Sequence, residues 1–290
     1  MLDKSLTASS KRSYQKAYQH IKEFHDSLNL ELSLPISINR TIAFISYLHE
    51  KQYAPSTITT YLSAIAYYHK TLQLTDPTNS MLVRKCVKGL RKNNNRKEKP
   101  RVTLRALKAL IRVSDKQLNQ YEAKLFQCVA TMLFFGMFRI SELVGDERLG
   151  IEALNLNQLT LTRSSIKVKL TKFKHSNGEN AVVEMKEQKQ SKICPIKNAK
   201  NFLDIRGSRA GRLFRYENHK PVTKTSFAST LAKCSKAAGY NPPFTSHCFR
   251  IGGATEAAKR GRTEAEIKLL GRWKSNAYMK YTRKTKPLIL

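Results

Sequence analysis

The chain has 290 residues, of which 41% are hydrophobic, enough for two domains with apolar cores and too many for a disordered basic tail. Lysine and arginine number 53 against 21 acidic residues, and the formal charge of +32 indicates a polyanionic partner, with nucleic acid the default. No apolar run approaches the roughly 20 residues of a membrane span, and the N-terminus lacks an apolar signal region. Charge alone leaves a ribosomal-type or membrane-surface protein open.

The first hundred residues predict four short amphipathic helices. Apolar residues recur at three- and four-residue steps from Tyr14 to Leu28, Ser37 suits the cap of a second helix, and Pro55 suits the first turn of a third. Ser80 suits the cap of a fourth helix, Met81–Leu90. We therefore predict a helical domain over residues 1–92. The fourth helix has a basic edge, the candidate DNA-binding surface, formed by Arg84, Lys85, Lys88, Arg91 and Lys92.

Residues 93–101, NNNRKEKPR, contain no apolar side chain except the proline, and predict a linker between domains. Its charges suit a strap across DNA phosphates or a nuclear import signal, and a solvated linker is an equally good interpretation. The charges in question are Arg96, Lys97, Lys99 and Arg101. The second domain then covers residues 102–290.

The second domain opens with a helix capped by Thr103 and a strongly apolar helix, Asn119–Phe138, which we expect in the core. Arg139 and Glu142 follow directly. A charged side chain at the end of a buried helix needs a partner or a ligand, so these two form either an ion pair alone or part of a binding site.

The hydrophobic period then changes to that of strands. Ser165–Leu170 alternates apolar and basic residues, Ala181–Met185 is β-rich, and Leu159–Leu161 is a candidate third strand. Asn177-Gly178 is a hairpin signal between the first two, beside the candidate lysines Lys172 and Lys174. Helices are expected again at Asn198–Arg206 and Thr223–Ala238, with a loop over residues 207–220 between them.

The most informative stretch is Phe244–Tyr281. With Ser246 as a cap, His247 and Arg250 lie near a helix N-terminus on neighbouring positions of one face, and Thr263 starts a last helix. A bidentate cation, a group that moves protons near neutral pH and free amide N–H groups together suit a phosphate. The alternative is a core histidine beside an arginine in a surface ion pair.

The run SHCFRIGGAT, then GRW, then Tyr281 eight residues after Trp273, resembles the C-terminal signature of the tyrosine recombinases, and GMFRISEL resembles their first-arginine motif. It is most similar to the Crypton and DIRS-like enzymes of eukaryotic mobile elements. The resemblance implies an α+β, mainly α fold: a helical core-binding domain, then a catalytic domain with a small antiparallel sheet, closing as a C-clamp on DNA. It also implies strand cleavage and rejoining through a 3′-phosphotyrosyl intermediate.

The resemblance assigns roles that the chemistry explains. Fixed guanidinium groups oppose the extra negative charge of a phosphorane-like state, and an attacking tyrosine must lose its proton to a base. We predict Tyr281 as the nucleophile and Lys174 as the general acid. Tyr278 and Lys172 remain the alternatives for these two roles. The predicted set is the phosphate-binding Arg139 and Arg250, the supporting Glu142, the general base His247, the general acid Lys174, the packing residue Trp273 and the nucleophile Tyr281.

No metal or nucleotide cofactor is expected, because the sequence has no carboxylate cluster and no glycine-rich phosphate loop. The cysteines stand singly, without zinc spacing, and are interpreted as reduced, mostly buried thiols of an intracellular protein. They are Cys86, Cys128, Cys194, Cys234 and Cys248.

The expected partners are double-stranded DNA and further copies of the chain, as a tetramer on synapsed DNA or a dimer at each site. The apolar Pro287–Leu290 is predicted to pack on a neighbouring subunit, or else on its own domain. The expected location is the nucleus, or the cytoplasm for a prokaryotic source. The rival functions are a DNA-binding protein of this fold without catalysis, a type IB topoisomerase-like enzyme and a basic RNA-binding protein.

Overall fold

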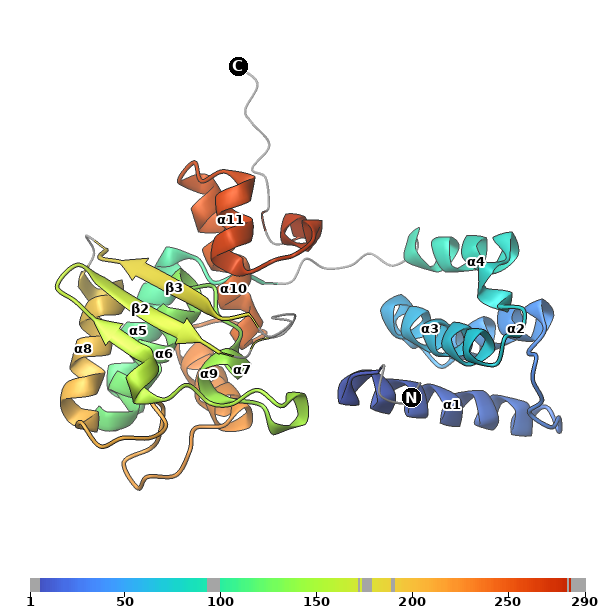
Figure 1. Cartoon of the computed structure of the whole chain (residues 1–290), viewed down its shortest axis with the longest axis horizontal. Coiled ribbons are helices and arrows are strands. Elements are labelled where there is room, and N and C mark those ends of the chain that lie inside the picture. The colour runs from blue at the N-terminus through green and yellow to red at the C-terminus, as the bar shows by residue number, and fades with distance from the viewer. Residues whose placement is uncertain are drawn as a thin grey trace, which may run out of the picture. The chain divides into compact units, whose positions relative to one another are not determined.

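The computed structural model describes residues 6–92, 100–171, 173, 179–188, 191–280 and 282 (Figure 1). The chain divides into two compact units, Met1–Glu98 and Lys99–Leu290. Both are built mainly of helices, and the second also contains a small antiparallel sheet, which confirms the predicted fold class. In the predicted linker, residues 93–99 lie outside the described residues. Within the described ranges, no helix is both long and apolar enough to cross a membrane.

The first unit contains α1 (Ala8–Ser27), α2 (Ile38–Glu50), α3 (Pro55–Thr71) and α4 (Met81–Lys92), with a short 3₁₀ turn, η2 (Pro77–Asn79), before α4. Ser37 caps α2 by accepting a hydrogen bond from the Arg40 N–H, and Pro55 occupies the first turn of α3. Buried side chains such as Phe24, Phe44 and Ile58 form a core of its own. The four predicted helices are confirmed, and α4 extends two residues beyond the predicted Leu90.

The second unit is arranged around a buried central helix. This helix, α6 (Gln120–Phe135), packs against α5 (Leu104–Gln117), α8 (Pro195–Arg206) and α10 (Ser246–Lys259). The predicted end at Phe138 is wrong. The Gly136 N–H closes the last helical turn on the Met132 carbonyl, and Met137 adopts a left-handed conformation with φ of 47°. The chain then turns into the short helix α7 (Ile140–Val144).

The sheet has the order β1-β2-β3, all antiparallel, with β1 at Leu159–Leu161, β2 at Ser165–Leu170 and β3 at Ala181–Lys186. Ile166 pairs with Met185 and Val168 with Val183. These four side chains are buried, and the lysines between them on β2 are exposed, as the alternation predicted. Helix α8 contacts β2 and β3, and begins at Pro195 rather than the predicted Asn198. The predicted Asn177-Gly178 turn lies outside the described residues.

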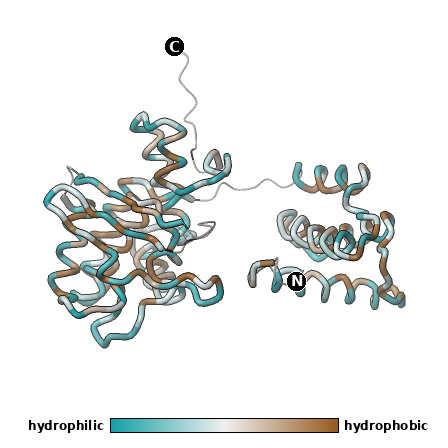
Figure 2. Tube along the Cα trace, in the orientation of Figure 1, coloured by the Kyte–Doolittle hydropathy of each residue, from teal (hydrophilic) through white to brown (hydrophobic). Residues whose placement is uncertain are grey.

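The remaining helices are α9 (Lys224–Ala237), α10 and α11 (Glu264–Gly271), with further 3₁₀ turns η3 (Glu147–Leu149), η4 (Leu156–Gln158), η5 (Ser191–Ile193) and η6 (Asn276–Lys280). Thr245 is the N-cap residue of α10, one position before the predicted Ser246, because its N–H and hydroxyl pair with the Cys248 thiol. Figure 2 shows apolar residues along the interior of this unit and hydrophilic ones in the loop between α8 and α9.

Two glycines bring α10 close to its neighbours. A Cβ placed on Gly252 would lie 1.9 Å from the Val102 carbonyl oxygen, and one on Gly253 would lie 2.1 Å from the Phe134 carbonyl oxygen. No side chain fits at these distances, so the pair allows direct packing of α10 on the end of α6 and on the chain entering α5. The backbone N–H of Val102 also donates to the Cys248 carbonyl at 3.1 Å.

Candidate active site

The turn after α6 places Arg139 at the start of α7 and Glu142 in its first turn. The Glu142 side chain is fully buried. Its Oε1 accepts a hydrogen bond from Arg139 Nη1 at 2.8 Å, and its Oε2 accepts one from the Arg139 backbone N–H at 2.9 Å. The Arg139 side chain is 25% exposed. The predicted ion pair therefore exists, and it leaves part of the Arg139 side chain exposed.

The Glu142 carboxylate also pairs with Arg272, an arginine that was not predicted from the sequence. Arg272 is the C-cap of α11, its backbone is left-handed with φ of 55°, and its side chain is 6% exposed. Its Nη2 donates to Glu142 Oε2 at 2.8 Å. Burial of Glu142 opposes its ionisation, but Arg272 and Arg139 outweigh burial and hold the pKa of the carboxyl below its ordinary value. The carboxylate is thus charged and shared by two arginines.

Arg250 belongs to the same cluster and is 1% exposed. Its guanidinium group donates to the carbonyl oxygens of Met137 and Gly271, and lies 4.3 Å from the centre of the Trp273 ring. The Met137 carbonyl also accepts a hydrogen bond from Arg272 Nη2 at 3.1 Å. The structure therefore brings Arg250 and Trp273 together as predicted, and connects Arg250 to Arg272 through one carbonyl oxygen.

His247 lies in the first turn of α10, three residues before Arg250, and its side chain is exposed. The alternative of a core histidine is therefore wrong. The first turn of a helix presents amide N–H groups without helical partners, which favours anionic ligands. His247 is placed where it can meet a ligand that the start of α10 attracts.

Lys172 and Lys174 lie outside the described residues, but the segments on either side of them are described. Leu170 and Thr171 line a small hollow together with Glu142. The Glu179 carboxylate lies 4.0 Å from the Lys274 ammonium, one residue after Trp273. The two ends of the connection between β2 and β3 therefore lie near Glu142 and Lys274.

Of the two candidate tyrosines, Tyr278 is described and Tyr281 lies outside the described residues. The Tyr278 side chain is buried, and its hydroxyl donates to the Glu264 carboxylate. That hydrogen bond raises the pKa of the Tyr278 phenol, with burial adding to the effect. A hydroxyl that is held by a carboxylate and made harder to ionise is poorly suited to attack a phosphate.

The basic residues predicted to bind DNA can be placed in part. All five on α4 are exposed. Arg84 Nη2 donates to the Asn79 carbonyl at 2.6 Å, and Arg91 Nη2 donates to the Thr59 hydroxyl at 3.1 Å. Arg101 is half-buried, whereas Arg96, Lys97 and Lys99 lie outside the described residues.

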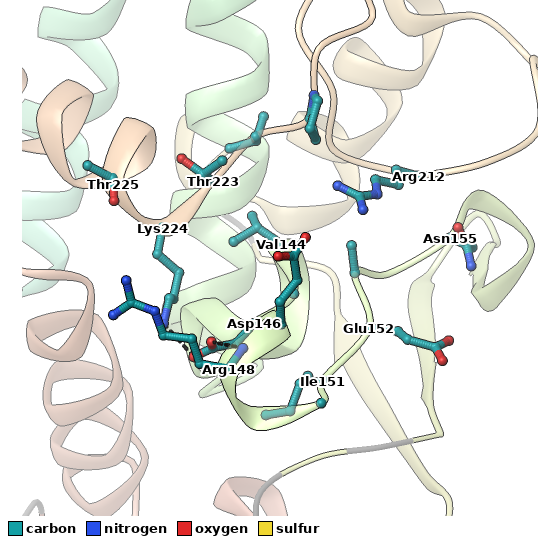
Figure 3. A pocket seen from close by; sticks show the side chains of 16 residues that line it. Val144, Asp146, Arg148, Ile151, Glu152, Asn155, Arg212, Thr223, Lys224 and Thr225 are labelled. Atoms are coloured by element: carbon teal, nitrogen blue, oxygen red, sulfur yellow. Dashed lines mark hydrogen bonds and ion pairs between the residues drawn. The ribbon is translucent and has the colours of Figure 1, made fainter. Parts of the chain in front are cut away.

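A separate, open cavity of about 950 Å³ lies between the segment 144–155 and the start of α9 (Figure 3). An ion pair between Asp146 and Lys224 joins its two sides. Its lining includes both the cation Arg148 and the carboxylate of Glu152. None of the predicted catalytic residues lines it. The described residues contain no group of three His, Cys, Asp or Glu side chains arranged to hold a metal, and the five cysteines are free, four of them buried.

No family model and no curated protein matches the sequence. Solved structures match over nearly the whole chain. The Tn1549 transposon integrase in complex with transposon right end DNA has a TM-score of 0.70 at 13% identity, with 96% of this chain and 90% of that chain covered. XerH site-specific recombinase bound to a palindromic difH substrate has a TM-score of 0.68 at 15% identity, covering 93% and 75%. A lambda integrase dimer bound to a COC′ core site has a TM-score of 0.65 at 10% identity, covering 97% and 73%.

These matches extend through both units, and the cluster of Arg139, Glu142, Arg250 and Trp273 is assembled from three separate parts of the second unit. The chain has the fold of the tyrosine recombinases and integrases.

Proposed function

We propose that this chain is a site-specific tyrosine recombinase of the Crypton and DIRS-like kind, which cleaves and rejoins DNA strands for a mobile element. The observation that carries the proposal is the charged Glu142, shared by Arg139 and Arg272 and adjoined by Arg250 under the Trp273 ring. Such a cluster holds the Arg139 guanidinium group in place, and a fixed guanidinium group opposes the negative charge of a phosphoryl-transfer transition state. Structures of the same fold contain DNA, which agrees with the +32 charge of this chain.

In the proposed reaction, the Tyr281 hydroxyl oxygen attacks the scissile phosphorus and the bond from phosphorus to the 5′ oxygen breaks. His247, exposed at the start of α10, accepts the tyrosine proton, and Lys174 donates a proton to the leaving 5′ oxygen. Arg139, whose side chain is 25% exposed, binds the phosphate. Arg250 is 1% exposed, so its contact with a phosphate requires a covering side chain to move.

The proposed partners are double-stranded DNA and other copies of the chain, as a tetramer on two synapsed sites within a nucleus. The segment Pro287–Leu290 lies outside the described residues, and we propose that its apolar side chains pack on a neighbouring subunit. Deleting it should reduce strand exchange much more than binding to one DNA site. Recombination at the wild-type rate after deletion, with the same assembly in sedimentation, would reject this role.

The deciding experiment is incubation with double-stranded DNA substrates nicked near candidate element ends, followed by a denaturing gel for covalent protein–DNA adducts. Wild-type protein should form an adduct, and Tyr281→Phe should form none while binding DNA as before, since only one hydroxyl is lost. Tyr278→Phe is the matched control and should still form adducts. Adducts from Tyr281→Phe that map to Tyr278 would overturn the assignment of the nucleophile.

The same assay separates the rival functions. Binding of all these substrates without any adduct from the wild-type protein would favour a DNA-binding protein that has lost catalysis. Relaxation of supercoiled plasmid by a monomer, with no strand exchange between two sites, would favour a topoisomerase. Tighter binding to single-stranded RNA than to duplex DNA would favour an RNA-binding protein.

A further inference from the structure

We infer that Arg272 is a positioning residue for the cleavage reaction, which acts on Arg139 through Glu142. The inference rests on the proposed function and adds a residue to it. Arg272 stands beside Trp273 in the sequence, yet its side chain turns away from solvent and reaches a carboxylate 130 residues earlier. The left-handed backbone at Arg272, rare for a residue other than glycine, is what directs the side chain inward.

The contacts of Arg272 leave it little freedom. Its Nη1 donates to the carbonyls of Leu270 at 2.9 Å and Gly136 at 3.2 Å, while its Nη2 donates to Glu142 and to the Met137 carbonyl. Its guanidinium carbon lies 4.9 Å from the centre of the Phe138 ring. Because its charge is paired with Glu142 and both terminal nitrogens are engaged by oxygens of the protein, we place the effect of Arg272 on the residues that it binds.

Glu142 is the residue through which that effect passes. Its two oxygens accept hydrogen bonds from Arg139 Nη1, the Arg139 N–H and Arg272 Nη2. With both arginines present, the Glu142 carboxylate holds the guanidinium group and the backbone N–H of Arg139, and Arg272 neutralises part of the carboxylate's charge. Without Arg272, the Glu142 carboxylate loses the second partner that fixes its orientation, so the Arg139 guanidinium group that it holds is no longer kept in one place.

Arg272 also joins two parts of the site. Its backbone continues into Trp273, which covers Arg250, and then into the segment of the candidate tyrosines. Its side chain binds the turn that carries Arg139. The ion pair between Arg272 and Glu142 therefore connects the turn that carries Arg139 to the segment that contains Trp273.

The test compares Arg272→Gln with Arg262→Gln, which removes an arginine whose side chain is 55% exposed and paired to Glu266. The first measurement is the rate of adduct formation on a nicked substrate at saturating DNA, with the Kd determined separately. Arg272→Gln should slow cleavage about 100-fold, the usual scale for a displaced catalytic group, with little change in Kd. Arg272→Lys keeps the charge opposite Glu142 but loses the planar fork, and should cleave at an intermediate rate. Arg262→Gln should cleave like wild type.

A double variant separates positioning from direct contact. In an Arg139→Ala background, Arg272→Gln should slow cleavage no further, because its effect ends at Arg139. A rate reduced by the product of the two single effects would overturn the inference, as would a wild-type rate for Arg272→Gln. Thermal unfolding of each variant checks that the measured rates belong to folded protein.

A second measurement needs no DNA and no activity. In nitrogen-15 spectra of the full chain labelled at arginine, hindered rotation of the Arg139 guanidinium group should be seen in the wild type and in Arg262→Gln, and should be lost in Arg272→Gln. Unchanged Arg139 signals in Arg272→Gln would reject the inference. If the wild-type protein forms no adduct on any DNA, the proposed function fails, and these spectra alone decide whether Arg272 positions Arg139.

Discussion

Helix α4 and the Glu142 cluster are both rich in basic residues, and they differ in how those residues are held. The five on α4 are exposed, and two of them hydrogen-bond only to neutral oxygens of their own unit in the contacts described. Around Glu142, two of three arginines are almost fully buried and each bonds to defined oxygens. Exposed cations contribute through their number and are screened by salt, whereas buried ones contribute through fixed geometry. Under the proposed function, basic residues therefore serve affinity in one unit and chemistry in the other.

The largest effect is expected from removing the shared carboxylate. Glu142→Ala leaves Arg272 buried without its counter-charge, and should lower the free energy of unfolding of the second unit by about 3–5 kcal/mol at neutral pH. Urea unfolding followed by fluorescence measures this, because Trp273 is the single tryptophan of the chain and lies against Arg250. Glu266→Ala, which breaks an exposed pair with Arg262, is the control and should have a much smaller effect.

The same comparison has a defined pH dependence. The folded-state pKa of Glu142 lies below the ordinary value of 4.5, so the ionised carboxylate contributes stability that is fully present above pH 4.5. That stability is lost as the pH falls through the lowered folded-state pKa. The difference in unfolding free energy between wild type and Glu142→Ala should therefore be constant from neutral pH down to 4.5 and shrink below it. A difference that grows on acidification would show that Glu142 is not held as a carboxylate.

The next effect concerns Arg139, the most exposed of the three arginines, with a side chain 25% exposed. Arg139→Ala removes one donor to the phosphate, which should slow adduct formation by about 100- to 1,000-fold while Kd changes little. Arg260→Ala removes an exposed arginine that is paired with Glu256 and should leave the rate unchanged. Equal slowing by both variants would mean that total charge, and not the site, limits cleavage.

The smallest effect per residue is expected on α4. Replacing Lys85, Lys88 and Lys92 by Gln should make the slope of log affinity against log salt less negative by up to about 2.7, since each phosphate contact contributes about 0.9. Cleavage at saturating DNA should stay at the wild-type rate, because these side chains belong to the other unit.

A matched triple variant on α1 tests whether the α4 face is special. Arg12, Lys16 and Lys22 are exposed on α1, and their replacement by Gln removes the same charge. The salt slope should then change much less than with the α4 variant. The same change in slope from both variants would show that the number of charges matters and the α4 face does not.

The sequence predicted most elements because their signals are local. Caps such as Ser37 and Thr103, the proline at the start of α3 and the alternation along β2 depend on a few neighbouring residues, and the structure has each element there. The grouping of Arg139, Glu142, Arg250 and Trp273 followed from the resemblance, since no local pattern joins residues so far apart in the chain. Lys174 and Tyr281 stay predictions.

The end of α6 and the role of Arg272 were missed for related reasons. The apolar pattern of α6 continues to Phe138, but the helix ends at Phe135, and the left-handed Met137 offers its carbonyl to Arg250 and Arg272. Arg272 was missed because its inward direction depends on a left-handed residue after α11. The motif GRW, which contains Arg272, was the only feature of the sequence that pointed to this residue. Periodicity reports neither left-handed residue, because it follows the apolar side chains of a helix and not the backbone beyond its end.

The close packing of Gly252 and Gly253 has a consequence for the interpretation of related sequences. Both positions require glycine because the carbonyl oxygens of Val102 and Phe134 occupy the space that a side chain would need. No step of phosphoryl transfer is involved in this requirement. A homologue that keeps this fold without the proposed DNA cleavage would still need both glycines, whereas nothing in the fold would require it to keep Tyr281. Among homologues, conservation of both glycines would therefore indicate that the fold is kept, and only conservation of the proposed catalytic residues would indicate that the activity is kept.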